Sequence, residues 1–124
     1  MTTLSDKLIA SVMQAYVDAM SGDDVEKVLV LFSDDAVVED PVGSDAHRGK
    51  DALRVFYQAS IDSVDHMVLE GSVRVREKWG AAAMIASPKG IDMKVETLDV
   101  MEFNDEGLIA HMTAYWGDTN LRVK

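Results

Sequence analysis

The stretch IDMKVETLDVMEFNDEGLIAHMTAYW, residues 91–116, decides the fold because its side chains alternate between two faces along two runs. Residues 91–103 and 108–116 each have the period of two that is typical of a β-strand. The segment NDEG between them is a turn signal. Residues 67–76 and 79–87 show the same period upstream, so most of the second half of the chain is predicted to form strands.

The first half of the chain has the period of amphipathic helices instead. Apolar side chains recur every four residues over 4–20, which predicts a helix that ends near Gly22. Asp23 and Glu26 resemble a capping box, which predicts that a second helix begins there and reaches Phe32.

A short strand ending at Asp40 and a third helix following Gly49 complete the predicted elements. Helices in the first half and strands in the second predict an α+β fold, with three N-terminal helices packed on one side of an antiparallel sheet. The chain has 124 residues and neither a linker nor an internal repeat, so one domain spanning residues 1–124 is predicted.

Composition and charge exclude several classes of function. The chain contains no cysteine, which excludes disulfides, thiolate metal ligands and thiol nucleophiles. Its formal net charge of −10 disfavours nucleic acid and anionic membranes as partners, so a neutral or cationic ligand is expected. No run of about 18 apolar residues is present, so no membrane span is predicted. The first residues lack the apolar segment of a signal peptide, and a cytoplasmic location is expected.

One aspartate closes the short strand, in the segment DDAVVEDPVG at residues 34–43. Asp40 ends the apolar run and precedes Pro41, which restricts the Asp40 backbone to extended geometry. Because Asp-Pro is also an ordinary way to begin a turn, this acid does not define a site by itself.

A second aspartate falls on the apolar face of the strand at 91–103. Alternation places Asp99 on the same face as Val95, Met101 and Phe103, whereas the glutamates of this strand point the other way. An acid on an apolar face must be paired or protonated, unless the strand register is slipped or bulged. Both readings are open from this strand alone.

Two tyrosines and one apolar face supply the remaining candidates. Tyr16 and Tyr57 lie on apolar helix faces, where a tyrosine ordinarily ends with its hydroxyl at the rim of the core. Met112, Ala114 and Trp116 share one face of the last strand, which fits either a core or the wall of a cavity.

No metal site or nucleophile is indicated. The three histidines lack metal-ligand spacing, and His111, on the opposite face of the last strand, is expected to be structural. Neither a glycine-rich phosphate loop nor a serine elbow is present. Two unusual acids, one or two tyrosines and an apolar wall suit proton transfer on an apolar, uncharged substrate.

Five segments carry a resemblance to a known family: VMQAYVDAM (12–20), LFSDDAVVEDPVGS (31–44), RGKDALRVFY (48–57), LDVMEF (98–103) and MTAYWGDTNL (112–121). Together they resemble the bacterial steroid delta-isomerases, also called ketosteroid isomerases, within the nuclear-transport-factor-like cone-fold superfamily. The resemblance covers nearly the whole chain. It implies a cone-shaped apolar pocket, a homodimer, and conversion of a 3-oxo-Δ5 steroid to its conjugated 3-oxo-Δ4 isomer with no cofactor and no metal.

The resemblance also implies a role for each candidate. Asp40 matches the general base, Tyr16 the main oxyanion donor, and Asp99 a second donor that is kept protonated. Tyr57 matches a tyrosine that hydrogen-bonds the main donor. The wall of the steroid pocket corresponds to Met112, Ala114 and Trp116.

The chain departs from the family pattern at two places. Phe32 stands where some members carry a further tyrosine, and the hairpin at 87–90 is short, with Ile85 and Ser87 where larger apolar side chains are frequent.

Two other functions also fit the scaffold. A polyketide cyclase or epoxide hydrolase would use a different polar set, and a non-catalytic binding or dimerisation module has no reason to bury Asp99.

Overall fold

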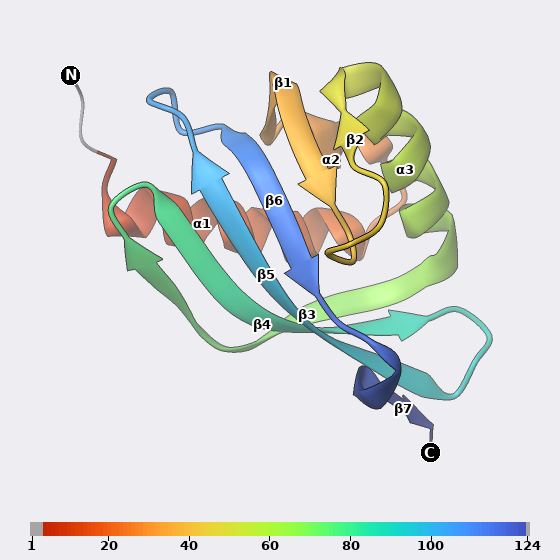
Figure 1. The fold of residues 1–124 in the computed structure, drawn as a ribbon. Helices are drawn as coiled ribbons and strands as arrows, with labels where there is room; N and C mark the ends of the chain where they lie inside the picture. Colours follow the sequence, from red (N-terminus) through yellow and green to blue (C-terminus); the bar gives the residue numbers. More distant parts are fainter. Residues whose placement is uncertain (1–3, 124) are drawn as a thin grey trace.

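The computed structural model describes residues 4–123, which form three α-helices and a curved seven-stranded sheet (Figure 1). The helices are α1 (Asp6–Met20), α2 (Val25–Leu29) and α3 (Gly49–Ser63). The strands are β1 (Phe32–Glu39), β2 (His47–Arg48), β3 (Val64–Arg76), β4 (Trp79–Pro88), β5 (Met93–Phe103), β6 (Ile109–Tyr115) and β7 (Leu121–Val123), with a 3-10 helix at Asp118–Asn120. The α+β class is confirmed, whereas β2, β7 and the 3-10 helix were not predicted. Within 4–123, no helix has the length and apolar character needed to cross a membrane.

The short helix α2 differs from its prediction at both ends. Its N-cap is Asp24, which accepts a hydrogen bond from the Glu26 N–H at 3.0 Å, so the prediction of Asp23 as the cap was wrong by one residue. The helix ends at Leu29, and Phe32 begins β1. The sequence around this boundary is a short apolar run, in which helix and strand cannot be distinguished by periodicity.

The sheet is mixed, so the prediction of a wholly antiparallel sheet was wrong at one pair. The strand order is β2-β1-β6-β5-β4-β3, and β7 pairs with β5. Within this order β1 and β6 run parallel, and the other paired strands are antiparallel. The chain passes through α3 and three long strands between β1 and β6, and a connection of that length permits parallel pairing.

The register of β5 places its aspartate inside the protein. Asp99 is 2% exposed, whereas the adjacent Leu98 is 45% exposed. Met101 and Phe103 are buried on the same face as Asp99. The alternative of a slipped register is therefore excluded for this strand.

In β6, a bulge interrupts the predicted alternation. Glu102 of β5 pairs with His111, but Phe103 pairs with Ile109, so β6 contains one extra residue at this point. Ile109 is consequently buried in the same core as Met112, although strict alternation placed the two side chains on opposite faces.

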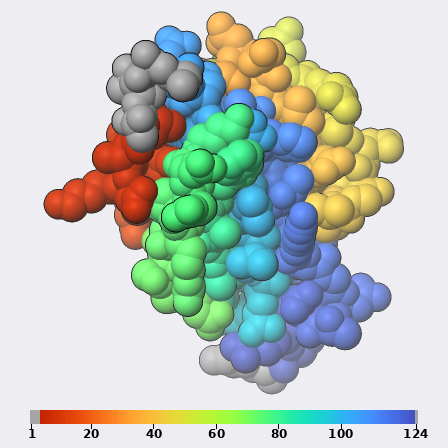
Figure 2. Space-filling view, turned by 60° about the vertical axis from the view of Figure 1, so that its left-hand side comes forward, coloured from red at the N-terminus to blue at the C-terminus, as the bar shows by residue number. Residues whose placement is uncertain are grey.

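The helices cover one face of the sheet and leave the other open. α1 packs on β3 and β4, and α3 packs on β1. Gly80 of β4 permits the close approach of α1, because a Cβ there would lie 2.6 Å from Met13 Sδ and 2.8 Å from Ile9 Cγ2. Figure 2 shows the segments of β3 to β6 (green to blue) side by side at the surface, between the red N-terminal helix and the yellow segment.

Candidate active site

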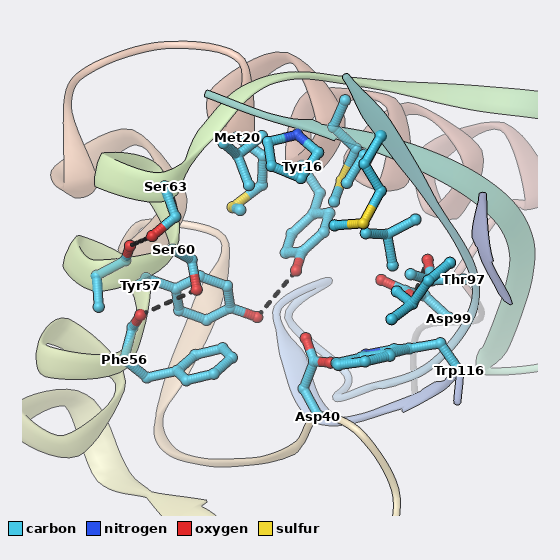
Figure 3. Close-up of a pocket in the computed structure, with 18 residues that line it drawn as sticks. Tyr16, Met20, Asp40, Phe56, Tyr57, Ser60, Ser63, Thr97, Asp99 and Trp116 are labelled. Atoms are coloured by element: carbon cyan, nitrogen blue, oxygen red, sulfur yellow. Dashed lines mark hydrogen bonds between the residues drawn. The ribbon is translucent and has the colours of Figure 1, made fainter. Parts of the chain in front are cut away.

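A cavity of about 520 Å³ opens between α1, α3 and the inner face of the sheet (Figure 3). The described residues that line it are Tyr16, Met20, Asp40, Phe56, Tyr57, Ala59, Ser60, Ser63, Val64, Met67, Ala86, Pro88, Met93, Val95, Thr97, Asp99, Trp116 and Leu121. Most of these side chains are apolar, and a few polar groups converge among them. This composition is typical of a binding pocket for an apolar small molecule.

Asp40 lies directly after the last residue of β1 and reaches the cavity from the loop. Trp116 Nε1 donates a hydrogen bond to Asp40 Oδ1 at 2.7 Å. The loop is tied to β6, because the Val42 N–H donates to the Ala114 carbonyl at 2.8 Å. Burial raises the pKa of Asp40 above its usual value, while the Trp116 hydrogen bond and the charge of His47 oppose that rise. The result is a fixed carboxylate whose basicity is increased by partial desolvation.

Two buried tyrosines meet at the cavity. Tyr16 on α1 and Tyr57 on α3 have their hydroxyl oxygens 3.1 Å apart. Phe32 packs against both rings, with centroid distances of 6.3 and 5.4 Å, and adds no hydroxyl to the pair. Burial is the main cause that raises the pKa of both tyrosines well above 10, so both hydroxyls are neutral near pH 7. When Tyr57 donates to the Tyr16 oxygen, the Tyr16 hydrogen is free to bond a ligand.

Asp99 presents a second carboxyl group from β5. Thr97 Oγ1 donates a hydrogen bond to Asp99 Oδ1 at 3.0 Å. Burial raises the pKa of Asp99 to about 7, the negative charge of Asp40 adds to this rise, and the Thr97 hydrogen bond opposes it. The two acids therefore occupy different environments within one cavity, Asp40 near solvent and Asp99 enclosed.

The predicted apolar wall is only partly at the cavity. Trp116 lines it, but Met112 and Ala114 are 0% and 1% exposed and are not among the described residues that line the cavity. Both lie in the hydrophobic core instead. Alternation indicates which face of the sheet a side chain occupies, but not whether a helix or an open space covers that face.

Sequence reasoning missed three polar neighbours of the site. His47 stacks on Phe56, with ring centroids 4.3 Å apart, and its charge acts on Asp40. Ser60 reaches the cavity while its hydroxyl donates to the Phe56 carbonyl at 3.0 Å. Its position three residues after Tyr57 on α3 was an available signal, because such pairs share a helix face. The third is Thr97, and its position two residues before Asp99 on the same strand face was the available signal.

Within the described residues 4–123, no three His, Asp or Glu side chains lie close enough together to hold a metal ion. The polar groups at the cavity include the Asp40 carboxylate near solvent, the neutral hydroxyls of Tyr16 and Tyr57, and the Asp99 carboxyl with its raised pKa. Such a set can accept a proton from a ligand and stabilise negative charge on a ligand oxygen.

Comparison with known proteins assigns the family. The model of the SnoaL-like domain matches residues 13–112. The chain belongs to the SnoaL-like domain family. The matched range includes Tyr16, Asp40, Tyr57 and Asp99, and it ends before Trp116.

Two relatives of this SnoaL-like chain carry described activities. A steroid Delta-isomerase from Nocardioides simplex is 32% identical over 119 residues, which cover 93% of this chain and 94% of that protein. The solved structure of SalBIII, an epoxide hydrolase/cyclase-like enzyme with a role in pyran ring formation in polyether salinomycin, has a TM-score of 0.86 and 25% identity, with 97% of this chain and 98% of that chain covered. The three helices and curved sheet are consistent with the nuclear-transport-factor-like cone fold.

Replacing Asp99 by Asn is expected to stabilise the SnoaL-like domain at alkaline pH. The pKa of Asp99 is raised from 3.8 to about 7 in the folded chain, so its protonated form favours folding, and this contribution is lost as the pH rises from about 4 through about 7. The loss amounts to about 4 kcal/mol above that range. Thermal unfolding should therefore give a higher Tm for Asp99→Asn than for wild type at pH 8.5, and similar values near pH 4.

The matched control is Asp105→Asn, which changes an exposed aspartate in the turn between β5 and β6. Its Tm should follow that of the wild type at both pH values. An unchanged Tm for Asp99→Asn at pH 8.5 would show that the Asp99 carboxyl is hydrated in solution.

Proposed function

We propose that this chain is a steroid delta-isomerase, which moves the double bond of a 3-oxo-Δ5 steroid into conjugation as the 3-oxo-Δ4 isomer. The observation that carries the proposal is the convergence of Asp40, Tyr16 and Asp99 on one apolar cavity. The similarity to the steroid Delta-isomerase of Nocardioides simplex over nearly the full length of both proteins supports it.

Asp40 is the proposed base of this reaction. Its carboxylate takes the proton from the carbon between the carbonyl and the double bond, and the electron pair of that C–H bond moves into a dienolate. The same carboxyl then returns the proton to the distal carbon of the former double bond. Proton and electrons balance within the substrate, so the reaction needs no cofactor.

Tyr16 and Asp99 are the proposed donors to the dienolate oxygen. Both groups are buried at the cavity, and in their neutral forms both carry an O–H. Donors that are fixed in a water-poor site stabilise a developing oxyanion more strongly than water does. An apolar ligand also removes water from around Asp99, which keeps its pKa high and its proton in place.

The alternative is an epoxide hydrolase or cyclase, and the likeness to SalBIII favours it. In that reaction Asp99 would give its proton to an epoxide oxygen while Asp40 takes one from the attacking hydroxyl. The Tyr16–Tyr57 pair favours isomerisation, because Tyr57 can orient the Tyr16 hydroxyl as a donor to a carbonyl oxygen whose negative charge grows. A non-catalytic binding module would gain nothing from the buried Asp99.

One assay distinguishes these functions. The full chain is mixed with an unconjugated 3-oxo-Δ5 steroid, and the growth of conjugated-enone absorbance is followed. An isomerase increases that rate in proportion to protein concentration, and Asp40→Asn in parallel reports the background. An absorbance trace that matches the background would contradict the proposal and leave cyclisation or binding.

We also propose that the open face of the sheet forms a homodimer. That face exposes large apolar side chains, with Val68, Leu98 and Tyr115 at 47%, 45% and 45%. Burial of such a patch favours association. Sedimentation at micromolar concentration should give a species of twice the chain mass, and a species of single chain mass alone would contradict the dimer.

A further inference from the structure

One contact at the cavity has no part in the reaction described so far. Thr97 and Asp99 are two residues apart on the same face of β5, and both line the cavity. The Thr97 hydroxyl donates to Asp99 Oδ1 at 3.0 Å, and Asp99 itself is 2% exposed. In Figure 3, the Tyr16 hydroxyl and the Asp99 carboxyl point into the same cavity.

The orientation of a carboxylic acid matters when it must donate a hydrogen bond. The group has two oxygens and one proton, so either oxygen can be the protonated one. The terminal torsion of an aspartate is broad, so the carboxyl group can also rotate and point its O–H in different directions. An oxygen that already accepts a hydrogen bond is better suited to be the carbonyl oxygen of the acid. The contact with Thr97 therefore favours protonation of Oδ2.

We propose that Thr97 is a positioning residue, which holds Oδ1 of Asp99 as the acceptor and leaves the acid proton on Oδ2 for the ligand oxygen. This inference rests on the proposed isomerase function for its kinetic consequence. Its structural content, the control of the Asp99 carboxyl by Thr97, is independent of the reaction.

Thr97 also affects the pH at which Asp99 loses its proton. Of the ionisable groups that line the cavity, Asp40 from the loop after β1 adds to the rise in the pKa of Asp99. Asp99 in turn contributes to the raised pKa values of Tyr16 on α1 and Tyr57 on α3. None of the described residues lining the cavity is Lys, Arg or His. The Thr97 hydroxyl is thus the group that opposes the rise in the pKa of Asp99, because it stabilises the ionised carboxylate.

Removal of the Thr97 hydroxyl should therefore lower kcat and raise the pKa of Asp99. Thr97→Val keeps the β-branched shape that suits a strand but deletes the donor. The kcat at a pH where Asp99 is protonated should fall by about threefold to tenfold, as expected for one lost hydrogen bond. The alkaline limb of kcat/KM should at the same time move to higher pH, because Asp99 holds its proton more tightly. KM should change little, since the apolar walls are intact.

Thr97→Ser is the matched control, because it keeps the hydroxyl and removes only the methyl group. Its kcat and alkaline limb should stay close to those of the wild type. A loss in Thr97→Val that Thr97→Ser shares in full, without movement of the limb, would indicate a packing role and overturn the proposal.

A measurement without substrate separates this inference from the proposed function. The side-chain carboxyl carbon of Asp99 is followed by NMR through a pH titration of the full-length chain, with its signal assigned by its absence in Asp99→Asn. Asp99 should titrate at higher pH in Thr97→Val than in wild type and Thr97→Ser. An equal or lower titration midpoint in Thr97→Val overturns the inference, whether or not the chain isomerises steroids. A raised midpoint in a chain without isomerase activity supports the inference and contradicts only the function.

Discussion

Asp40→Asn is expected to reduce the isomerisation rate by about 10⁴-fold, the upper end of the effect of a general base. An amide is far too weak a base to take a proton from carbon, and the shape of the side chain is nearly unchanged. The other acid among the described residues that line the cavity is Asp99, which the proposal requires in its protonated form. The measurement is the rate of conjugated-enone formation at saturating substrate.

The same substitution at Asp99 provides the contrast. Asp99→Asn keeps a hydrogen-bond donor of similar shape, so its rate should fall by roughly tenfold or less, whereas Asp99→Ala deletes the donor and should lower the rate by about 10²-fold. Both asparagine variants are neutral, so the comparison separates proton acceptance from hydrogen-bond donation. Equal losses at the two positions would contradict the roles assigned to these acids, and a fully active Asp99→Ala would remove Asp99 from the site.

Tyr16→Phe should lower kcat by about 10²–10³-fold with a much smaller effect on KM. The Tyr16 hydroxyl interacts most strongly when negative charge has developed on the ligand oxygen, so its loss affects the transition state more than the bound substrate. Steady-state kinetics over a range of steroid concentrations separates the two constants. A variant with raised KM and unchanged kcat would contradict the oxyanion role.

The control for this prediction is Tyr57→Phe. Tyr57 contacts the Tyr16 oxygen at 3.1 Å and is buried beside it, so its hydroxyl orients the donor rather than replacing it. The loss in kcat should be clearly smaller than for Tyr16→Phe. A Tyr57→Phe variant that is as impaired as Tyr16→Phe would indicate that Tyr57 is itself the donor.

The kinds of element and the burial of single side chains could be predicted from local pattern. Alternation along 91–103 placed Asp99 on the apolar face but left a slipped register open, and the structure decides for burial, with Asp99 2% exposed. The pattern failed at the bulge in β6, which buries Ile109. It also failed at the end of α2, because a short apolar run has no periodicity that separates helix from strand. Alternation assumes an uninterrupted strand, so one inserted residue reverses the faces assigned on one side of it.

The composition of the site was predicted more completely than its contacts. Tyr16, Asp40, Tyr57, Asp99 and Trp116 do line one cavity. The hydrogen bond from Trp116 Nε1 to Asp40 joins the residue that follows β6 to the loop after β1, and no sequence spacing indicates it. Met112 and Ala114, which share a predicted face with Trp116, are instead covered by core.

The sequence by itself therefore determined where the long helices and strands lie and that Asp99 shares a strand face with apolar side chains. The tertiary structure decided which neighbours those acids meet: Trp116 for Asp40, and for Tyr16 its partner Tyr57. The physical reason is that periodicity depends on the geometry of one element, whereas pairing depends on strand order and on the space between layers. The parallel pairing of β1 with β6 brings Asp40, the residue after β1, beside the end of β6.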